Sequence, residues 1–174
     1  RRLWCVDPMD GTKEFIDKNG MFVVMIGLAI DGEARLGVVY QPTEDLLLWG
    51  AEGTSGVILN GESVAHGVSD CRSPADAALV VSRSHRSKTI ASVAESLGAH
   101  KQIRLGSVGL KVAYLVQGKA EIYLSTSNLM MEWDTCAPEA ILRAVGGKVT
   151  DARGEPLRYN KTVPGTLYGI LASN

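Results

Sequence analysis

The sequence predicts a layered α/β fold that forms one structural domain. Residues 21–64 hold apolar runs separated by the turn dipeptides Asp31-Gly32 and Asn60-Gly61, and this pattern indicates an antiparallel meander. After residue 65, strand-like runs alternate with helix-like segments, which is typical of a layered α/β arrangement. We therefore divide the chain into residues 1–64, which hold an N-terminal motif and the meander, and residues 65–174, the α/β half.

The first half begins with a short apolar run, Leu3-Trp4-Cys5-Val6, which leads into a tight turn. A short helical or irregular stretch over residues 12–20 follows the turn. The polar segment 66–76 is a connector to the second half. Between these segments, apolar runs that end at Gly, Asn or Pro turn signals predict strands at residues 21–30, 36–40, 46–49 and 57–59.

The second half alternates between two periodicities. Each predicted helix ends at a glycine stop signal, as Gly98 and Gly118 illustrate, and Ser87 is a capping residue for the first helix. Short β-branched runs separate the helices and predict strands. The predicted helices are 87–97, 108–116 and 134–145, and the predicted strands are 79–82, 102–105, 121–124, 148–150 and 167–171.

Composition excludes several classes of function. The 174 residues carry 18 basic and 19 acidic side chains, so no bulk positive field favours a nucleic-acid polymer. The longest apolar run, residues 21–30, is too short to span a bilayer, and no membrane partner is expected. The three cysteines form no Cys-x-x-Cys pair, which suits a reducing cytoplasm. Neither a P-loop nor a Gly-x-Ser-x-Gly elbow is present.

The most informative segment is Trp-Cys-Val-Asp-Pro-Met-Asp-Gly-Thr-Lys-Glu at residues 4–14. Asp7 and Asp10 bring two carboxylates to one turn, and hard cations such as Mg²⁺ take oxygen ligands of this kind. Gly11 lets the backbone approach a ligand closely, and the amides of Gly11 and Thr12 favour a bound phosphate. The alternative is an ordinary turn, since Asp-Pro and Asp-Gly are common turn dipeptides.

A second acidic segment, residues 132–139, stands at the head of a predicted helix. Asp134 precedes the apolar-periodic residues of that helix, so it is a candidate third metal ligand. The alternative is that Asp134 is only a helix cap. Glu132 has the pattern of an exposed loop acid, with a further acid near the metals as the alternative, and Trp4, Trp49 and Trp133 are expected in the core.

These two segments together resemble the inositol monophosphatase superfamily of Mg²⁺-dependent, lithium-sensitive phosphomonoesterases. The Asp-Pro-Met-Asp-Gly-Thr run at 7–12 and Trp133-Asp134 correspond to its two signatures. The sequence is most similar to the 3′(2′),5′-bisphosphate nucleotidase branch, which acts in sulfur metabolism. The segments that carry this similarity are 12–15, 82–85, 106–111 and 133–139.

The resemblance implies an α-β-α-β-α sandwich that here lacks its N-terminal helices, and it implies Mg²⁺ as the cofactor. It assigns the metal ligands to Asp7, Asp10, Asp134 and the backbone carbonyl of Met9. It assigns catalysis to Asp7 and to Thr12, whose hydroxyl orients the attacking water. Residues 1–64 thus carry the metal-binding turn, and residues 65–174 carry the third metal acid and the nucleotide-side residues. The implied substrate-binding residues are Gly11, Thr12, His85, Ser107 and Lys111.

The expected activity is hydrolysis of the 3′(2′)-phosphate of adenosine bisphosphates such as 3′-phosphoadenosine 5′-phosphate. Two alternatives stay open: an inositol monophosphatase-like hydrolase of small polyol or sugar phosphates, and a non-catalytic phospho-ligand-binding fragment. The branch often carries an arginine after the Tyr-Leu strand, where this chain has Ser125, so the second phosphate is less securely assigned. The alternative for His85 is a surface turn residue without a binding role. The alternative for Lys111 is a residue on the solvated edge of a helix.

The resemblance also places an acidic metal ligand upstream of the Asp-Pro signature, ahead of Arg1. We therefore expect this chain, tested alone, to be a poor catalyst. The expected partner is a small-molecule phosphate, and a homodimer is left open.

Overall fold

The computed structural model describes residues 1–84 and 87–174. The strands are β1 (Arg2–Asp10), β2 (Val23–Ile30), β3 (Glu33–Gln41), β4 (Leu46–Ala51), β5 (Thr54–Leu59), β6 (Glu62–Ser63), β7 (Ala78–Ser82), β8 (Lys101–Leu105), β9 (Ile122–Ser125), β10 (Lys148–Thr150) and β11 (Ile170–Ser173). The helices are α1 (Thr12–Ile16), α2 (Lys88–Leu97), α3 (Val108–Val116) and α4 (Glu132–Ala144).

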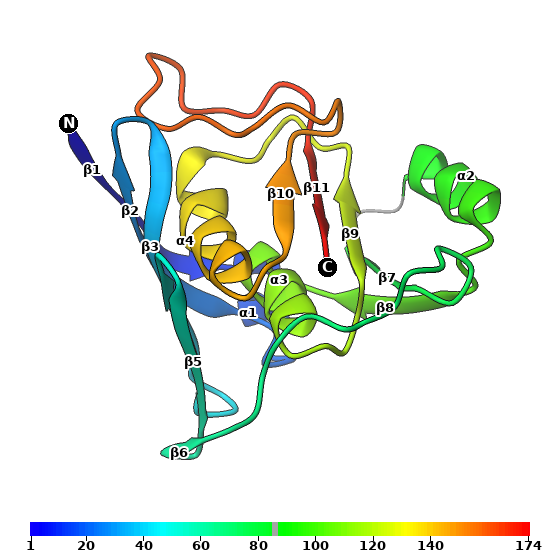
Figure 1. The fold of residues 1–174 in the computed structure, drawn as a ribbon, viewed down its shortest axis with the longest axis horizontal. Coiled ribbons are helices and arrows are strands. Elements are labelled where there is room, and N and C mark those ends of the chain that lie inside the picture. The colour runs from blue at the N-terminus through cyan, green and yellow to red at the C-terminus, as the bar shows by residue number, and fades with distance from the viewer. Residues whose placement is uncertain (85–86) are drawn as a thin grey trace.

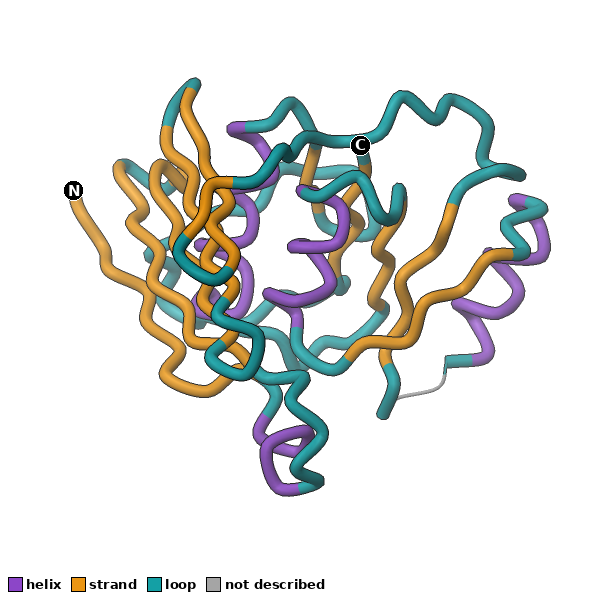
Figure 2. Tube along the Cα trace, turned by 90° about the horizontal axis from the view of Figure 1, so that it is seen from below, coloured by secondary structure: helices purple, strands orange, loops and turns teal. Residues whose placement is uncertain are grey.

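The elements form two sheets with helices between them and on one outer face. The first sheet is an antiparallel meander in the order β1-β2-β3-β4-β5-β6, and the second has the mixed order β10-β11-β9-β7-β8. Figures 1 and 2 show α3 and α4 between the sheets and α2 beyond the second sheet. The predicted layered α/β class is therefore confirmed.

Strand β1 differs from the predicted strand followed by a turn. It continues through the whole Asp-Pro-Met-Asp segment, and its pairing with β2 shifts register between Asp7 and Asp10. A bulge of this kind at the end of a sheet tolerates Pro8, which has no N–H for a ladder hydrogen bond. The bulge changes the direction in which the side chains of this segment point. The two acids therefore belong to a bulged strand and not to a turn.

A row of glycines across three strands seats helix α4 on the first sheet. Gly27, Gly37 and Gly50 are direct cross-strand neighbours on β2, β3 and β4. A Cβ on Gly37 would lie 2.1 Å from the carbonyl oxygen of Ala137, and one on Gly27 would lie 2.7 Å from the Ala137 amide nitrogen. The helix backbone therefore lies directly on the sheet, at a distance that only glycine permits.

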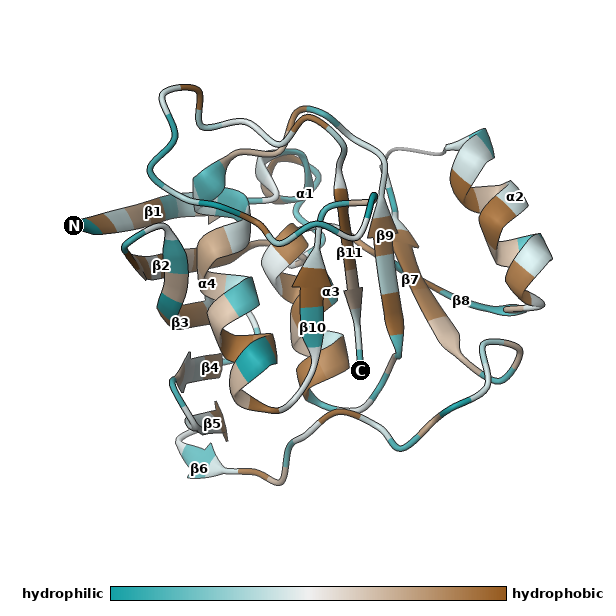
Figure 3. Cartoon of the chain, turned by 45° about the horizontal axis from the view of Figure 1, so that its top comes forward, coloured by the Kyte–Doolittle hydropathy of each residue, from teal (hydrophilic) through white to brown (hydrophobic). Residues whose placement is uncertain are grey.

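The main buried cluster contains residues from both predicted halves, from Cys5 to Ala172. A smaller cluster joins Ile90 and Ala94 of α2 to Leu79 of β7. Figure 3 shows the hydrophobic residues along β7, β9 and β11. The division into residues 1–64 and 65–174 stays a prediction.

The tryptophans do not form the core that the sequence indicated. Trp4 is 57% exposed and Trp133 is 40% exposed, while Trp49 is half-buried. Trp4 shares the outer face of the first sheet with Val6 and Ile26, which are also exposed. Alternation along β1 puts Cys5 inward and its neighbours outward, so an indole ring in an apolar run is not necessarily buried.

Candidate functional site

Three acidic side chains from distant parts of the chain meet at one place. Asp7, Asp10 and Asp134 each offer a carboxylate oxygen, and these oxygens lie within 4.8 Å of one another. Asp10 ends β1, whereas Asp134 lies in the first turn of α4, 124 residues later in the chain. The two motifs that the sequence singled out are thus brought together.

Backbone amides hold all three carboxylates in place. The Met9 amide donates to Asp7 Oδ1 at 2.9 Å, and the Gly109 amide donates to Asp10 Oδ2 at 2.8 Å. The Met131 amide donates to Asp134 Oδ2 at 2.7 Å. Helix α4 begins at Glu132, two residues earlier than predicted, so Asp134 lies at the third helical position. It therefore caps the helix and faces the other two acids at once.

The cluster is electrostatically costly without a cation. Burial raises the pKa of Asp10 to about 6, with the nearby charge of Asp7 adding to the effect. Burial also raises the pKa of Asp134 to about 7, helped by the charges of Asp10 and Asp7 and by a side-chain hydrogen bond with Asp7. A bound divalent cation would remove this repulsion, and the all-oxygen donor set suits a hard ion such as Mg²⁺. The residues therefore fit the group that the resemblance implies.

We expect Mg²⁺ to stabilise the protein more at about pH 8 than at about pH 5. The folded-state pKa values of Asp10 and Asp134 lie above the usual value, 3.8, so the folded state binds more protons than the unfolded state between about pH 4 and pH 7. Their contribution to the stability of the metal-free protein is therefore lost as pH rises through that window. For buried Asp10, the raised pKa corresponds to a loss of about 3 kcal/mol at most in the free energy of unfolding of the metal-free protein across this pH range.

The measurement is thermal denaturation with a chelator and with Mg²⁺ across this pH range. NaCl at equal ionic strength is the control, because it screens exposed charges without occupying the cluster. An equal gain in Tm from Mg²⁺ at both ends of the range would contradict the expectation.

A cavity of about 420 Å³ opens beside the cluster, and Asp10 belongs to both. Its walls come from three segments: the Asp10–Glu14 turn, the end of β7, and the start of α3. A fourth wall is the loop after β9. The residues that line it include Gly11, Thr12, Lys13, Glu14, Ser82, Ser84, Gly106, Val108, Lys111, Tyr123, Ser125, Thr126, Ser127 and Leu129.

Lys111 is a buried cation on the cavity wall. Only 3% of the residue is exposed, its Nζ donates to the Gly106 carbonyl, and Nζ lies 5.3 Å from the centre of the Tyr123 ring. Burial lowers the pKa of Lys111 to about 8, against the opposing charges of Asp10 and Glu14. Lys111 therefore does not lie on a solvated edge of the helix, which was the alternative to a binding role. Within residues 1–84 and 87–174, no carboxylate lies within ion-pair distance of Nζ.

The predicted phosphate-binding residues lie where β1 meets α1. Gly11 has φ 95° and ψ 42°, a left-handed conformation that favours glycine, and a Cβ there would lie 3.0 Å from the Met21 carbonyl oxygen. The Thr12 hydroxyl donates to the Met9 carbonyl at 3.3 Å. This hydrogen bond places the hydroxyl beside the Met9 carbonyl, the oxygen that the resemblance assigned to the metal. Thr12 is also exposed and lines the cavity.

Two predicted substrate residues have different outcomes. Ser107 is 1% exposed, and its hydroxyl accepts a hydrogen bond from the Leu110 amide at 2.9 Å, so it caps α3. It is not among the cavity-lining side chains of the described chain, and its contact with substrate stays a prediction. His85 lies outside the described residues.

Glu132 is not the exposed loop acid that the sequence indicated. It is 4% exposed, and its carboxylate accepts hydrogen bonds from the amides of Asn160 and Lys161 at 2.8 and 3.0 Å. These contacts tie a distant loop to the first turn of α4, next to Asp134. A local pattern gives no signal for a contact of this sequence separation.

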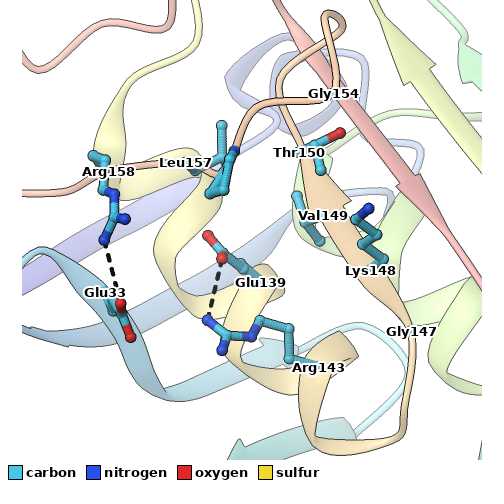
Figure 4. Close-up of a pocket in the computed structure, with 11 residues that line it drawn as sticks. Glu33, Glu139, Arg143, Gly147, Lys148, Val149, Thr150, Gly154, Leu157 and Arg158 are labelled. Atoms are coloured by element: carbon cyan, nitrogen blue, oxygen red, sulfur yellow. Dashed lines mark hydrogen bonds and ion pairs between the residues drawn. The ribbon is translucent and has the colours of Figure 1, made fainter.

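A second cavity, of about 360 Å³, lies against the last turns of α4 (Figure 4). Four of its charged side chains form two ion pairs: Arg158 with Glu33 at 3.2 Å, and Arg143 with Glu139 at 3.5 Å. Of the predicted metal-binding and substrate-binding residues that the structure describes, none lines it. The chemistry is therefore concentrated in the cavity that contains Asp10.

Sequence reasoning missed Glu14 and Arg83 as members of the site. The Glu14 carboxylate accepts hydrogen bonds from Arg83 and Ser84, which lie 69 and 70 residues later in the chain. A signal was present, since both residues belong to segments that carry the resemblance. Their contact, however, joins α1 to the segment that follows β7, and no local pattern reveals it.

Among the described residues, no helix is long and apolar enough to cross a membrane.

A family model described as the inositol monophosphatase family matches residues 1–173. The chain is 37% identical to 3′(2′),5′-bisphosphate nucleotidase 1 of Rattus norvegicus over 186 residues, which cover 98% of this chain and 56% of the relative. It is 38% identical to the 3′(2′),5′-bisphosphate nucleotidase CysQ of Escherichia coli K12, over 91% of this chain and 63% of the relative.

Solved structures agree with these sequence matches. CysQ from Bacteroides thetaiotaomicron superposes with a TM-score of 0.87 at 34% identity, over 99% of this chain and 70% of that chain. The inositol monophosphatase from Anabaena superposes with a TM-score of 0.81 at 30% identity, over 99% and 67%. The chain thus spans little more than half the length of the rat relative.

Proposed function

The chain belongs to the inositol monophosphatase family, and we propose that the protein containing it is a Mg²⁺-dependent phosphatase of adenosine bisphosphates. It would remove the 3′(2′)-phosphate from compounds such as 3′-phosphoadenosine 5′-phosphate. The observation that carries the proposal is the convergence of Asp7, Asp10 and Asp134 beside a cavity with a buried cation. The names of the rat and Escherichia coli relatives support the choice of substrate.

The chain's own residues have distinct roles in this proposal. The carboxylates of Asp7, Asp10 and Asp134, with the carbonyl of Met9, would hold the metal. Gly11 permits the left-handed backbone conformation in which the amides of Gly11 and Thr12 are available to a phosphate. The Thr12 hydroxyl orients the attacking water next to Asp7. The chemistry that Mg²⁺ supplies when bound is charge neutralisation on the phosphate and a lower pKa for a coordinated water.

Lys111 is the proposed contact for the second phosphate of the nucleotide. A buried ammonium without a carboxylate partner is costly unless an anion compensates it. The second phosphate of a bisphosphate would supply that anion in the cavity that Lys111 and Asp10 both line. Lys111 would therefore select doubly phosphorylated substrates, whereas the acidic cluster acts on any phosphomonoester.

One observation favours hydrolysis of small polyol or sugar phosphates as a second candidate function. The wall formed by Ser125, Thr126 and Ser127 is hydroxyl-rich and contains no cation. Hydroxyls suit a polyol as well as a ribose.

The test is phosphate release from 3′-phosphoadenosine 5′-phosphate, adenosine monophosphates and inositol monophosphate, with and without Mg²⁺. It uses the 174-residue chain and a version extended upstream. We expect the bisphosphate to be the preferred substrate and its hydrolysis to require Mg²⁺. Preference for inositol monophosphate would favour the second candidate. Binding without turnover in either form would indicate a non-catalytic phospho-ligand module.

Substitution of Lys111 with alanine should discriminate between substrates. We expect turnover of the bisphosphate to fall about tenfold to a hundredfold, since one charged contact is worth about 1.5–3 kcal/mol. Turnover of a simple monophosphate should change by much less. Lys119→Ala is the control, because Lys119 is an exposed lysine whose Nζ bonds Gln117. Equal losses on both substrates would mean that Lys111 serves folding alone.

Lithium sensitivity, a cytoplasmic location and a homodimer remain predictions from the resemblance. Inhibition by Li⁺ would support the metal assignment, because the ion competes for the same oxygen ligands.

A further inference from the structure

Glu14 is a buried carboxylate that accepts hydrogen bonds from three side chains. Only 2% of the residue is exposed, although it lies in the five-residue helix α1 next to the phosphate-binding turn. Arg83 Nη1 donates to Glu14 Oε2 at 2.5 Å, and Ser84 Oγ donates to Glu14 Oε1 at 2.6 Å. Asn19 Nδ2 also donates to Oε2. These three hydrogen bonds hold the carboxylate in place, and Glu14 is not among the acids that converge in the cluster.

Glu14 is the point at which three walls of the cavity meet. The turn at Gly11 and Thr12 precedes it, and Ser82 and Ser84 form the wall at the end of β7. Gly106 forms the third wall, and a Cβ there would lie 2.3 Å from Glu14 Cγ. The Glu14 side chain therefore links α1, next to the phosphate-binding turn, to the segment that follows β7.

The charges around Glu14 are balanced locally. Arg83 Nη1 lies 2.5 Å from Glu14 and 3.6 Å from Asp17, so two carboxylates compensate its charge. Although burial alone would raise the pKa of Glu14, the donors Ser84, Asn19 and Arg83 hold that pKa below its ordinary value. Glu14 therefore remains an anion, and Arg83 is retained as its partner rather than left available for a substrate phosphate.

The network also fixes the backbone on both sides. Asn19, which donates to Glu14, accepts a hydrogen bond from the Met21 amide at 3.0 Å through its Oδ1. On the other side, the Arg83 amide donates to the Leu105 carbonyl at 2.9 Å. Movement of either segment therefore requires that at least one charge-assisted hydrogen bond to Glu14 breaks.

We propose that Glu14 is a positioning residue that holds the Ser82–Ser84 wall against the phosphate-binding turn, and thereby gives the site its preference for a nucleotide over a compact phosphomonoester. The proposal rests on the proposed function, because it concerns the same cavity. A compact substrate needs only the turn and the acidic cluster. A nucleotide extends further, so it depends on the separation between the turn and the opposite wall.

The first experiment compares Glu14→Ala and Glu14→Gln in the full-length protein. For 3′-phosphoadenosine 5′-phosphate, we expect Glu14→Ala to raise KM at least about tenfold with kcat little changed, since small misplacements of binding groups have effects of this size. For a compact ester such as glycerol phosphate, both constants should change by less than about threefold. Glu14→Gln keeps an acceptor oxygen and should recover part of the loss.

The matched control is Asp17→Asn, which removes a second carboxylate near Arg83 but does not contact Ser84. It should leave both substrates nearly unaffected. If Glu14→Ala fails to fold, Glu14→Gln carries the same comparison of substrates. Equal losses on the nucleotide and the compact ester would overturn the proposal.

The second experiment is hydrogen exchange, which does not require a substrate. Glu14→Gln should speed exchange at the Arg83 amide and its neighbours in Ala78–Ser84, and leave β2 and β3 unchanged. Unchanged exchange in Ala78–Ser84 would overturn the positioning role. If the unaltered protein hydrolyses no bisphosphate but exchange responds as expected, the proposed substrate is wrong while the structural coupling stands.

Discussion

Replacement of Asp134 with asparagine should reduce Mg²⁺-dependent phosphate release at least about 100-fold and should also raise the Tm of the metal-free protein. Residues that only support a metal ligand typically cost about 10- to 100-fold when they are changed, so a ligand itself should cost more. The gain in Tm follows from the raised pKa of Asp134, which burial and the charges of Asp10 and Asp7 cause. A neutral amide removes that repulsion and can still accept the hydrogen bond from Met131.

A gain of about 1 kcal/mol in stability would raise Tm by about 2–4 °C in a chain of this size. The first measurement is phosphate release in the presence of Mg²⁺. The second is thermal denaturation in the presence of a chelator at about pH 8, a pH at which Asp134 is ionised. Asp70→Asn is the control, because Asp70 is exposed and belongs neither to the acidic cluster nor to the lining of the cavity beside it. A variant that loses activity and also loses Tm would show that Asp134 mainly serves the helix.

Replacement of Gly37 with alanine should be the most destabilising single-methyl change in the first sheet. The new Cβ would lie 2.1 Å from the carbonyl oxygen of Ala137, and neither the strand that carries the Cβ nor the helix backbone that carries the oxygen can move aside easily. Overpacking of this kind typically costs about 1–3 kcal/mol, and here we expect the upper end of that range. A loss of about 3 kcal/mol corresponds to a fall in Tm of about 6–12 °C.

The same substitution should weaken the response to Mg²⁺, because α4 carries Asp134. A helix lifted by about 1 Å would separate Asp134 from Asp7 and Asp10, and displacements of that size can cost about 100-fold in rate. The control is Gly165→Ala, since a Cβ at Gly165 would have its nearest neighbour, Met131 Sδ, at 3.8 Å. An unchanged Tm in Gly37→Ala would mean that α4 is not seated on the glycine row.

The sequence was a good guide to the elements because their signals are local. Both residues of Asp31-Gly32 have positive φ, 51° and 84°, as do Asn60 and Gly61, and this is the conformation that these hairpin dipeptides favour. Ser87 caps α2 through a hydrogen bond from the Ile90 amide, and Gly98 ends the helix in a left-handed conformation. Each of these features depends on residues that are close in the chain.

The features that the sequence did not predict depend on distant partners. Trp4 is exposed because the strand alternates, and Glu132 is buried because a loop near residue 160 reaches it. The convergence of Asp10 and Asp134 was predicted only through the resemblance, since an acid at a helix head is compatible with a simple cap. The link between Glu14 and Arg83 required the relative position of two sheets, which no short pattern encodes.

The 124 residues between Asp10 and Asp134 have a consequence for folding kinetics. Within the meander, each strand pairs with the strand next to it in sequence, so the meander is the part of low contact order that can form first. The three acids come together only when α4 docks on the glycine row, after most of the chain has been made. A nascent chain that stops before α4 therefore has two of the carboxylates but no complete centre. Mg²⁺ would bind only the docked state and stabilise it by mass action. Acceleration of refolding by Mg²⁺ should then be small, whereas slowing of unfolding should be large, because the centre is absent from an early transition state.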